Sequence, residues 1–196
     1  MTEYLLAIDV GTSALHCLLT DTRAQPIASI QAPISYYTPV DCSTLSREID
    51  PQFILGTVEG LIASLLRQQN IASREIVAIG VTSQRQAVAF LDSDGRERYV
   101  SPNVDLRAVF EGASIDYELG DQAYRTTGHF PSFMLAAARL RWLRQHRPEV
   151  FECVTCLLPL ASWLAFRFTG NLITEISLDA EAGLIDIHTR KRNPDF

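Results

Sequence analysis

The sequence predicts one α/β domain with a helical elaboration in its second half. Its elements follow the order strands, helix, strands and then a helical segment, which is typical of α/β folds. Apolar residues make up 47% and charged residues 20% of the chain, values normal for a soluble globular domain with a core. A length of 196 residues fits one domain, or two very small ones. No internal repeat or low-complexity linker divides it.

The predicted strands come in two groups. Three apolar runs joined by tight turns predict an antiparallel meander at the N-terminus. They cover 4–9, 15–20 and 26–32. The run 76–81 is continuously apolar, so we expect a strand buried on both faces. Residues 87–91 predict another strand, closed by a turn at 92–95.

The first predicted helix follows the meander. Asp50 is a suitable N-cap and Pro51 fits the first helical position, while apolar residues from Ile54 to Leu65 recur at helical spacing. Further helices are expected in the second half, where Pro148 and Gly170 mark helix ends. They cover 105–119, 121–126, 133–146 and 159–168.

Composition and the N-terminal residues argue against several classes of partner and location. The net charge of −6 disfavours non-specific binding to nucleic acid or anionic lipid. No apolar run reaches about 18 residues, so no membrane span is expected. The N-terminus lacks the positive region of a secretory signal, and a cytoplasmic location is the expectation.

Four cysteines fit a reducing compartment without a disulfide scaffold: Cys17, Cys42, Cys153 and Cys156. The last two form a C-x-x-C, which could be half a zinc site or a redox pair. No second C-x-x-C or histidine pair accompanies it. We therefore interpret Cys153 and Cys156 as two small core residues.

The turn between the first two strands reads Asp9-Val-Gly-Thr-Ser13. Glycine lets the backbone approach a phosphate closely, and successive N–H groups of such a turn face one anion. Thr12 and Ser13 add hydroxyl donors, and Asp9 could hold Mg²⁺ directly or through water. The alternative is an ordinary hairpin turn, in which the same residue types are common. No G-x-x-x-x-G-K-[ST] motif of a P-loop occurs.

The whole chain resembles the FGGY carbohydrate kinases, a branch of the actin-like sugar kinases. The turn matches their opening D-x-G-T-[ST], and further segments follow in the family's order. These are Gly80–Gln86, Phe90–Gly95, Asn103–Ala108, Thr127-Gly128 with Leu140–Leu143, Trp163–Gly170 and Ser177–Asp186. The resemblance implies two ribonuclease-H-like domains with a cleft between them. ATP and Mg²⁺ would bind in this cleft, and the γ-phosphoryl group would be transferred to a hydroxyl of a sugar or polyol.

The resemblance also implies roles for individual residues. Asp9 would support the metal, and Gly11, Thr12 and Ser13 would face the transferring phosphate. Substrate-side residues would be Gln84, Arg85, Gln86, Asp105 and Arg107. Each has a structural alternative. Gln84 and Gln86 could be a polar loop, Arg85 could pair with an acid, Asp105 could cap the next helix, and Arg107 could be structural.

The sequence departs from the family pattern at several positions. His16 stands where Arg or Lys is usual, and Asn103 where Trp is usual. Arg85-Gln86 differs from the Met-His of xylulose kinases and the Arg-Glu of glycerol kinases, while Asn-Val-Asp-x-Arg-Ala is most similar to the autoinducer-2 kinase branch. Ser162 replaces an expected Asp.

Length is the largest departure. The family's general base and adenosine pocket are expected beyond Phe196, so we expect this chain to lack catalytic activity without a C-terminal domain. Apolar surface exposed by that absence would favour a homodimer. Two alternatives remain: a non-catalytic sugar- or nucleotide-sensing module of the same fold, and an actin-like ATPase with a conformational role. The family-like helical landmarks argue against the second.

Overall fold

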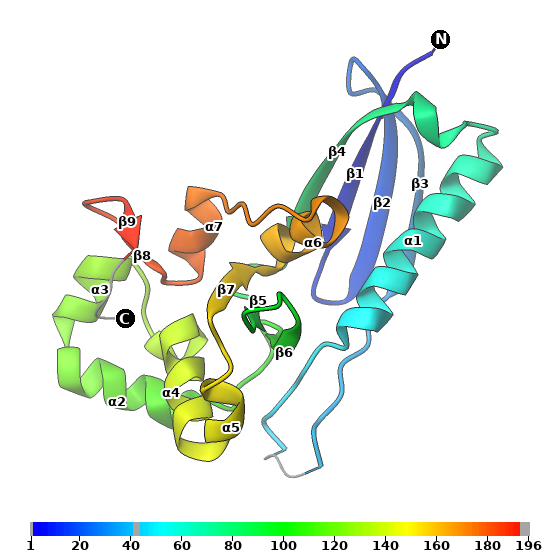
Figure 1. Ribbon diagram of the computed structural model, residues 1–196. Helices are drawn as coiled ribbons and strands as arrows, with labels where there is room; N and C mark the ends of the chain where they lie inside the picture. The colour runs from blue at the N-terminus through cyan, green and yellow to red at the C-terminus, as the bar shows by residue number, and fades with distance from the viewer. Residues whose placement is uncertain (1, 41–43, 193–196) are drawn as a thin grey trace. The chain divides into compact units, whose positions relative to one another are not determined.

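A computed structural model describes residues 2–40 and 44–192. The chain divides into two compact units. The sheet unit spans Met1–Ser35 and Asp50–Gln84, and the helical unit spans Tyr36–Ile49 and Arg85–Phe196. In Figure 1 the first unit carries β1 to β4 and α1, and the second carries the remaining labelled elements.

The sheet unit contains the predicted meander, which is confirmed. Strands β1 (Tyr4–Val10), β2 (Ala14–Asp21) and β3 (Pro26–Pro33) pair antiparallel, and β4 (Ile76–Ser83) adds to β1 in parallel. The strand order is therefore β3-β2-β1-β4. A short 3₁₀ helix, η1 (Ser73–Glu75), leads into β4.

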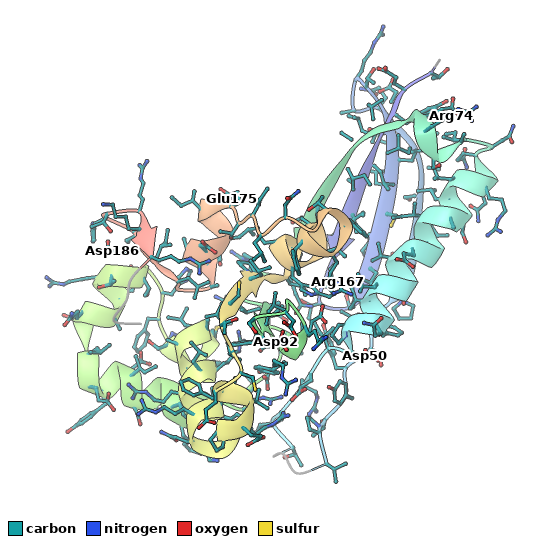
Figure 2. The ribbon with its side chains drawn as sticks, in the orientation of Figure 1. Asp50, Arg74, Asp92, Arg167, Glu175 and Asp186 are labelled. Atoms are coloured by element: carbon teal, nitrogen blue, oxygen red, sulfur yellow. The ribbon has the colours of Figure 1, made fainter. Side chains whose placement is uncertain are left out.

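One long helix, α1 (Pro51–Gln68), packs on β2 and β3 (Figure 1). The predicted cap is confirmed: the Asp50 carboxylate accepts a 2.9 Å hydrogen bond from the Gln52 N–H, at the start of the helix (Figure 2). Because strand side chains alternate between faces, one face of the sheet meets the helix. The buried core side chains are Leu6, Ile8, Val10, Leu15, Cys17 and Leu19 from the strands, and Ile54, Val58, Leu61 and Leu65 from α1.

The expectation of a strand buried on both faces at 76–81 is wrong. β4 lies at the end of the sheet, and α1 packs on β2 and β3 instead. Val77 and Ile79 are consequently 50% and 49% exposed. The apolar character of residues 76–81 did not predict that this strand lies at the end of the sheet with partly exposed side chains.

The helical unit contains a small antiparallel sheet with order β6-β5-β7 and a two-stranded hairpin. The strands are β5 (Val88–Leu91), β6 (Glu97–Ser101), β7 (Cys156–Pro159), β8 (Ile185–Asp186) and β9 (Lys191–Arg192). Its helices are α2 (Val109–Leu119), α3 (Asp121–Thr127), η2 (Ser132–Met134), α4 (Ala136–His146), α5 (Pro148–Phe151), α6 (Leu160–Thr169) and α7 (Ile176–Glu181). The turn at 92–95 joins β5 to β6, and the Asp92 carboxylate accepts backbone bonds within it.

Two predicted helices begin later than expected. The helix expected from 105 starts at Val109, because Asp105 is occupied by side-chain partners rather than by a helix N-terminus. The helix expected from 133 starts at Ala136, after the 3₁₀ turn η2. The helices at 121–126 and 159–168 are confirmed, and Gly170 ends α6 in the left-handed conformation that glycine favours.

The cysteines differ from expectation in one respect. Cys153 lies in the turn after α5 and is exposed, whereas Cys156 in β7 is half-buried. The interpretation of both as core residues is therefore wrong for Cys153. Cys17 is buried in the sheet unit, and Cys42 lies outside the described residues. None of the helices in the described ranges is both long and apolar enough to span a bilayer.

Candidate functional site

The β1–β2 hairpin is the first part of the site. It closes with a 3.0 Å hydrogen bond from the Gly11 N–H to the Ala14 carbonyl, and Thr12 and Ser13 lie exposed at its tip. A Cβ on residue 11 would lie 2.9 Å from the Ala14 carbonyl oxygen. The turn is thus too tight for a side chain at this position, and its tip is open to a ligand.

Asp9 lies on the sheet face opposite α1, because its neighbours Ile8 and Val10 point into the core. The strand register places it directly opposite His16 on β2 and Thr82 on β4. Asp9 is half-exposed and lines an open hollow of about 430 Å³. The other residues along this hollow are Ala7, Ile8, His16, Leu18, Gly80, Val81 and Thr82.

The donor set at Asp9 fits one kind of metal site. Within residues 2–40 and 44–192, no group of three or more His, Cys, Asp or Glu side chains could enclose a metal ion. Mg²⁺ is commonly held by one or two carboxylates together with phosphate oxygens and water. A single accessible carboxylate beside an anion-binding turn fits Mg²⁺ that arrives with a phosphate.

Gln84 follows β4 and contacts the hairpin. Its backbone N–H donates to the Val10 carbonyl at 2.8 Å, and its side-chain amide donates to the Gly11 carbonyl at 3.2 Å. The side chain is buried. Gln84 therefore braces the turn, a role that the strand-and-loop pattern of the sequence did not indicate.

Arg85 and Gln86 belong to the helical unit and differ in exposure. Arg85 is exposed, and its Nη1 lies 3.7 Å from the Glu181 Oε1 of α7. Gln86 is half-buried with φ of 63°, and its carbonyl accepts a hydrogen bond from Arg139. Glu181 and Arg139 are residues that the sequence analysis did not single out.

Asp105 and Arg107 form a buried ion pair. The Arg107 Nε lies 2.8 Å from the Asp105 Oδ2, and its Nη1 lies 3.0 Å from the Glu48 Oε1, with the Asp105 and Arg107 side chains fully buried. The Tyr99 hydroxyl also donates to Asp105. The Arg107 guanidinium lies over the rings of Tyr99 and Trp142, with centroids 4.5 and 4.9 Å away.

The charges of this cluster offset one another, because Arg107 contacts both Asp105 and Glu48. Burial opposes the charged form of Arg107, but its neighbours Tyr99, Asp105 and Glu48 together favour that form, so the pKa of Arg107 is raised. Burial, reinforced by Asp105, raises the pKa of Tyr99, so this phenol stays neutral. Arg107 thus has the structural environment that the sequence left open as an alternative. The Asp105 carboxylate accepts from the Arg47 and Arg107 N–H groups, whereas the N-cap of α2 is Ala108.

The described site residues fall into two sets. Asp9, Gly11, Thr12, Ser13 and Gln84 gather in the sheet unit; Arg85, Gln86, Asp105 and Arg107 belong to the helical unit. Sequence reasoning missed Glu48, because it meets Arg107 across 59 residues of chain. Sequence reasoning also missed Arg139, which follows three alanines in the helix expected over 133–146.

Comparison with protein families places all of these residues in one match. Residues 4–195 match the FGGY family of carbohydrate kinases, N-terminal domain. An autoinducer-2 kinase of Salmonella typhimurium is 28% identical over 192 residues, which cover 96% of this chain and 36% of that protein. One from Escherichia coli is 27% identical over 195 residues, covering 97% and 36%.

Solved structures give the same result. A gluconate kinase from Lactobacillus acidophilus has a TM-score of 0.88 at 25% identity, covering 100% of this chain and 39% of that one. A ligand-bound xylulose kinase from the same organism has a TM-score of 0.87 at 25% identity, covering 98% and 39%. The mixed sheet with flanking helices is therefore the actin-like fold of carbohydrate kinases, and the chain spans little more than a third of the relatives it matches.

Proposed function

Because the chain belongs to the FGGY family of carbohydrate kinases, as its N-terminal domain, we propose that it forms the phosphate- and substrate-binding part of an ATP-dependent kinase. The acceptor is a hydroxyl of a sugar or polyol. One observation supports this most strongly: a tight glycine turn lies beside a single carboxylate that faces an open hollow. That arrangement suits an anionic phosphoryl group accompanied by a divalent cation.

In this proposal the hairpin acts by positioning and charge. Asp9 would hold Mg²⁺, directly or through water, and the backbone and hydroxyls of Gly11, Thr12 and Ser13 would face the transferring phosphoryl group. When bound, Mg²⁺ neutralises the charge on the phosphate oxygens. Gln84 keeps the turn in shape through its bond to the Gly11 carbonyl. Phosphoryl transfer needs such preorganised positioning more than covalent help from the protein.

On the substrate side, we assign direct contact to Arg85 and to Gln86. Arg85 is exposed, and the Gln86 backbone carbonyl is held by a hydrogen bond from Arg139. Asp105 and Arg107 are buried against each other, so we assign them to holding the segment 102–108 rather than to touching the acceptor.

The proton on the acceptor hydroxyl needs a general base. We propose that this base and the adenosine pocket lie outside the 196 residues, since the chain spans about 36% of its curated relatives. The isolated chain would then bind phosphate ligands and transfer no phosphoryl group.

The test compares the complete gene product containing this sequence with the isolated chain. ATP consumption is measured with D-xylulose, xylitol, glycerol, D-gluconate and autoinducer-2 as acceptors. We expect turnover by the complete protein, none by the isolated chain, and loss of turnover in Asp9→Asn with unchanged thermal unfolding. Turnover by the isolated chain, or full activity of the Asp9→Asn variant, would contradict the proposal.

A second candidate is a non-catalytic sugar- or nucleotide-sensing module. The observation that favours it is His16, which lies opposite Asp9 where the family usually has Arg or Lys. A neutral histidine neutralises phosphate charge less well than those residues. Binding of MgATP or sugar by the complete gene product without any turnover would favour this candidate.

A further inference from the structure

The helical unit contains a cavity of its own, with a volume of about 670 Å³. Helices α2 and α4, which contact each other (Figure 1), line it with Phe110 and Glu111 and with Trp142 and His146. The volume falls within the range of roughly 300–1,000 Å³ that is common for small-molecule sites. The hollow beside Asp9 is lined by the sheet unit, so this cavity is separate from it.

Glu111 places a buried carboxylate in the wall of this cavity. Its side chain is 8% exposed, and its Oε1 lies 3.2 Å from the His146 Nε2. Among the described residues, no donor reaches its Oε2. A buried acceptor without a partner costs free energy, so this carboxylate favours a ligand that supplies an N–H group. Torsion about the last bond of a glutamate side chain is broad, so either oxygen can turn toward such a donor.

The two arginines at the cavity already have carboxylate partners. Arg107 pairs with Asp105 and Glu48, and the Arg147 Nη1 lies 3.1 Å from the Glu48 Oε1. Within the described ranges, neither an arginine nor a lysine pairs with Glu111, and the histidine beside it is charged only when protonated. The charge that lacks a counterpart at this cavity is therefore negative.

An exposed aromatic ring precedes this carboxylate on α2. Phe110 is 76% exposed and lines the cavity. The Trp142 ring, by contrast, already contacts the Arg107 guanidinium and the His146 ring, each 4.9 Å from its centroid. Because an aromatic face attracts a cation, Phe110 and Glu111 can contact the same positively charged group.

We propose that this cavity binds a small organic cation. An ammonium, amidinium or guanidinium group of the ligand donates to the Glu111 carboxylate and lies against the Phe110 ring. Anionic ligands are disfavoured, because a phosphate or carboxylate group would meet the like charge of Glu111. The inference does not depend on the proposed kinase function, since it concerns a different cavity and requires no phosphoryl group.

Three probes of similar shape and different charge test this inference. Benzamidine is cationic at neutral pH, benzamide is neutral and benzoate is anionic. Calorimetry measures the binding of each probe to the complete gene product. We expect benzamidine to bind at least about tenfold more tightly than benzamide, because charge-assisted hydrogen bonds are the stronger kind. Benzoate should bind more weakly than benzamide.

Two variants identify the residues that bind the probe. Glu111→Gln keeps the size of the side chain and removes its charge, so it should weaken benzamidine binding about tenfold and reduce the preference over benzamide. Phe110→Ala changes an exposed side chain and should weaken benzamidine binding severalfold without loss of folding. The matched control is Glu118→Gln, which removes an exposed carboxylate of the same helix and should leave binding unchanged.

Several results would overturn the inference. These are absence of benzamidine binding, equal affinity for benzamidine and benzamide, and an effect of Glu118→Gln as large as that of Glu111→Gln. Full benzamidine affinity in Phe110→Ala and Glu111→Gln would also do so, because the cation would then bind elsewhere. Thermal unfolding checks both variants, and Phe110→Ala decides alone if Glu111→Gln does not fold. None of these measurements uses ATP or a sugar, so failure of the proposed kinase function leaves their outcome unaffected.

Discussion

The Gln84 side-chain amide donates a 3.2 Å hydrogen bond to the Gly11 carbonyl, and its backbone N–H donates a 2.8 Å bond to the Val10 carbonyl. The end of β4 is thereby tied to the β1–β2 hairpin. The residue that follows a parallel strand thus controls the shape of a turn more than 70 residues earlier in the chain.

Removing this brace should loosen the turn. Gln84→Glu keeps the size of the side chain but replaces the donating amide with an acceptor that faces the Gly11 carbonyl. We expect a loss of about 1–3 kcal/mol in the free energy of unfolding. Urea denaturation measures this loss. Unchanged stability would show that the bond contributes nothing.

The hairpin should also reject a side chain at Gly11. Gly11→Ala puts a methyl group 2.9 Å from the Ala14 carbonyl oxygen, so the turn must open. We expect destabilisation of about 1–3 kcal/mol. Gly60→Ala is the matched control, because nothing lies within 4 Å of its added methyl and it sits inside α1. It should stabilise the protein by about 0.5–1 kcal/mol.

The buried charge cluster should be sensitive to the loss of one member. Asp105→Asn leaves Arg107 with Glu48 as its remaining carboxylate and puts one acceptor oxygen where two accepted hydrogen bonds. We expect a loss of about 3–5 kcal/mol in the free energy of unfolding. Glu118→Gln, at an exposed pair, should cost no more than about 1 kcal/mol. Equal effects of the two substitutions would contradict the structural role of Asp105.

The cysteines should differ in reactivity. Burial raises the pKa of the Cys17 thiol to about 11, whereas Cys153 is exposed. At pH 8 we expect iodoacetamide to modify Cys153 and to modify Cys17 about 100-fold more slowly, because the thiolate is the reactive form. Peptide mass mapping measures both rates, and unfolding in urea should equalise them.

The raised pKa of Cys17 should also make the free energy of unfolding depend on pH. The folded chain retains the Cys17 proton to a higher pH than the unfolded chain does, so this thiol should lower stability as pH rises from about 9 to about 11. Cys17→Ala should flatten the dependence in that window. An unchanged slope would contradict the assigned environment.

The exposed apolar side chains of β4 should promote association of the isolated chain. β4 is an end strand whose Val77 and Ile79 are half-exposed, and such edges pair readily with other chains. Ile79→Lys should shift sedimentation toward the monomer. Phe110→Lys, which removes a 76% exposed ring away from any strand edge, should have a smaller effect. Equal behaviour would exclude the β4 edge as the associating surface.

Local patterns predicted much of this fold. The meander follows from apolar runs separated by turns, and α1 from the Asp50 cap and Pro51. The glycine turn at 9–13 could be predicted because its residues are consecutive in the sequence. Its accessibility depends on strand alternation, which places Asp9 away from the core.

Long-range contacts set the limits of that prediction. Neither Glu48 nor Arg139 has a local pattern that reveals its partners, which lie 59 and 53 residues away in sequence. The exposure of β4 and of Cys153 likewise depends on what packs beside them. Arg85 and Glu181 form an ion pair although they lie far apart in the sequence. The sequence therefore indicated Arg85 as a site residue but not its partner.

The central claim is that the turn at 9–13 binds a phosphoryl group beside Mg²⁺. An NMR titration of the 196-residue chain with MgATP tests it most directly. We predict that the backbone amide signals of Gly11, Thr12 and Ser13 shift most, and that Asp9→Asn removes the dependence of these shifts on Mg²⁺. Shifts confined to other residues, or identical Mg²⁺ dependence in the variant, would contradict the claim.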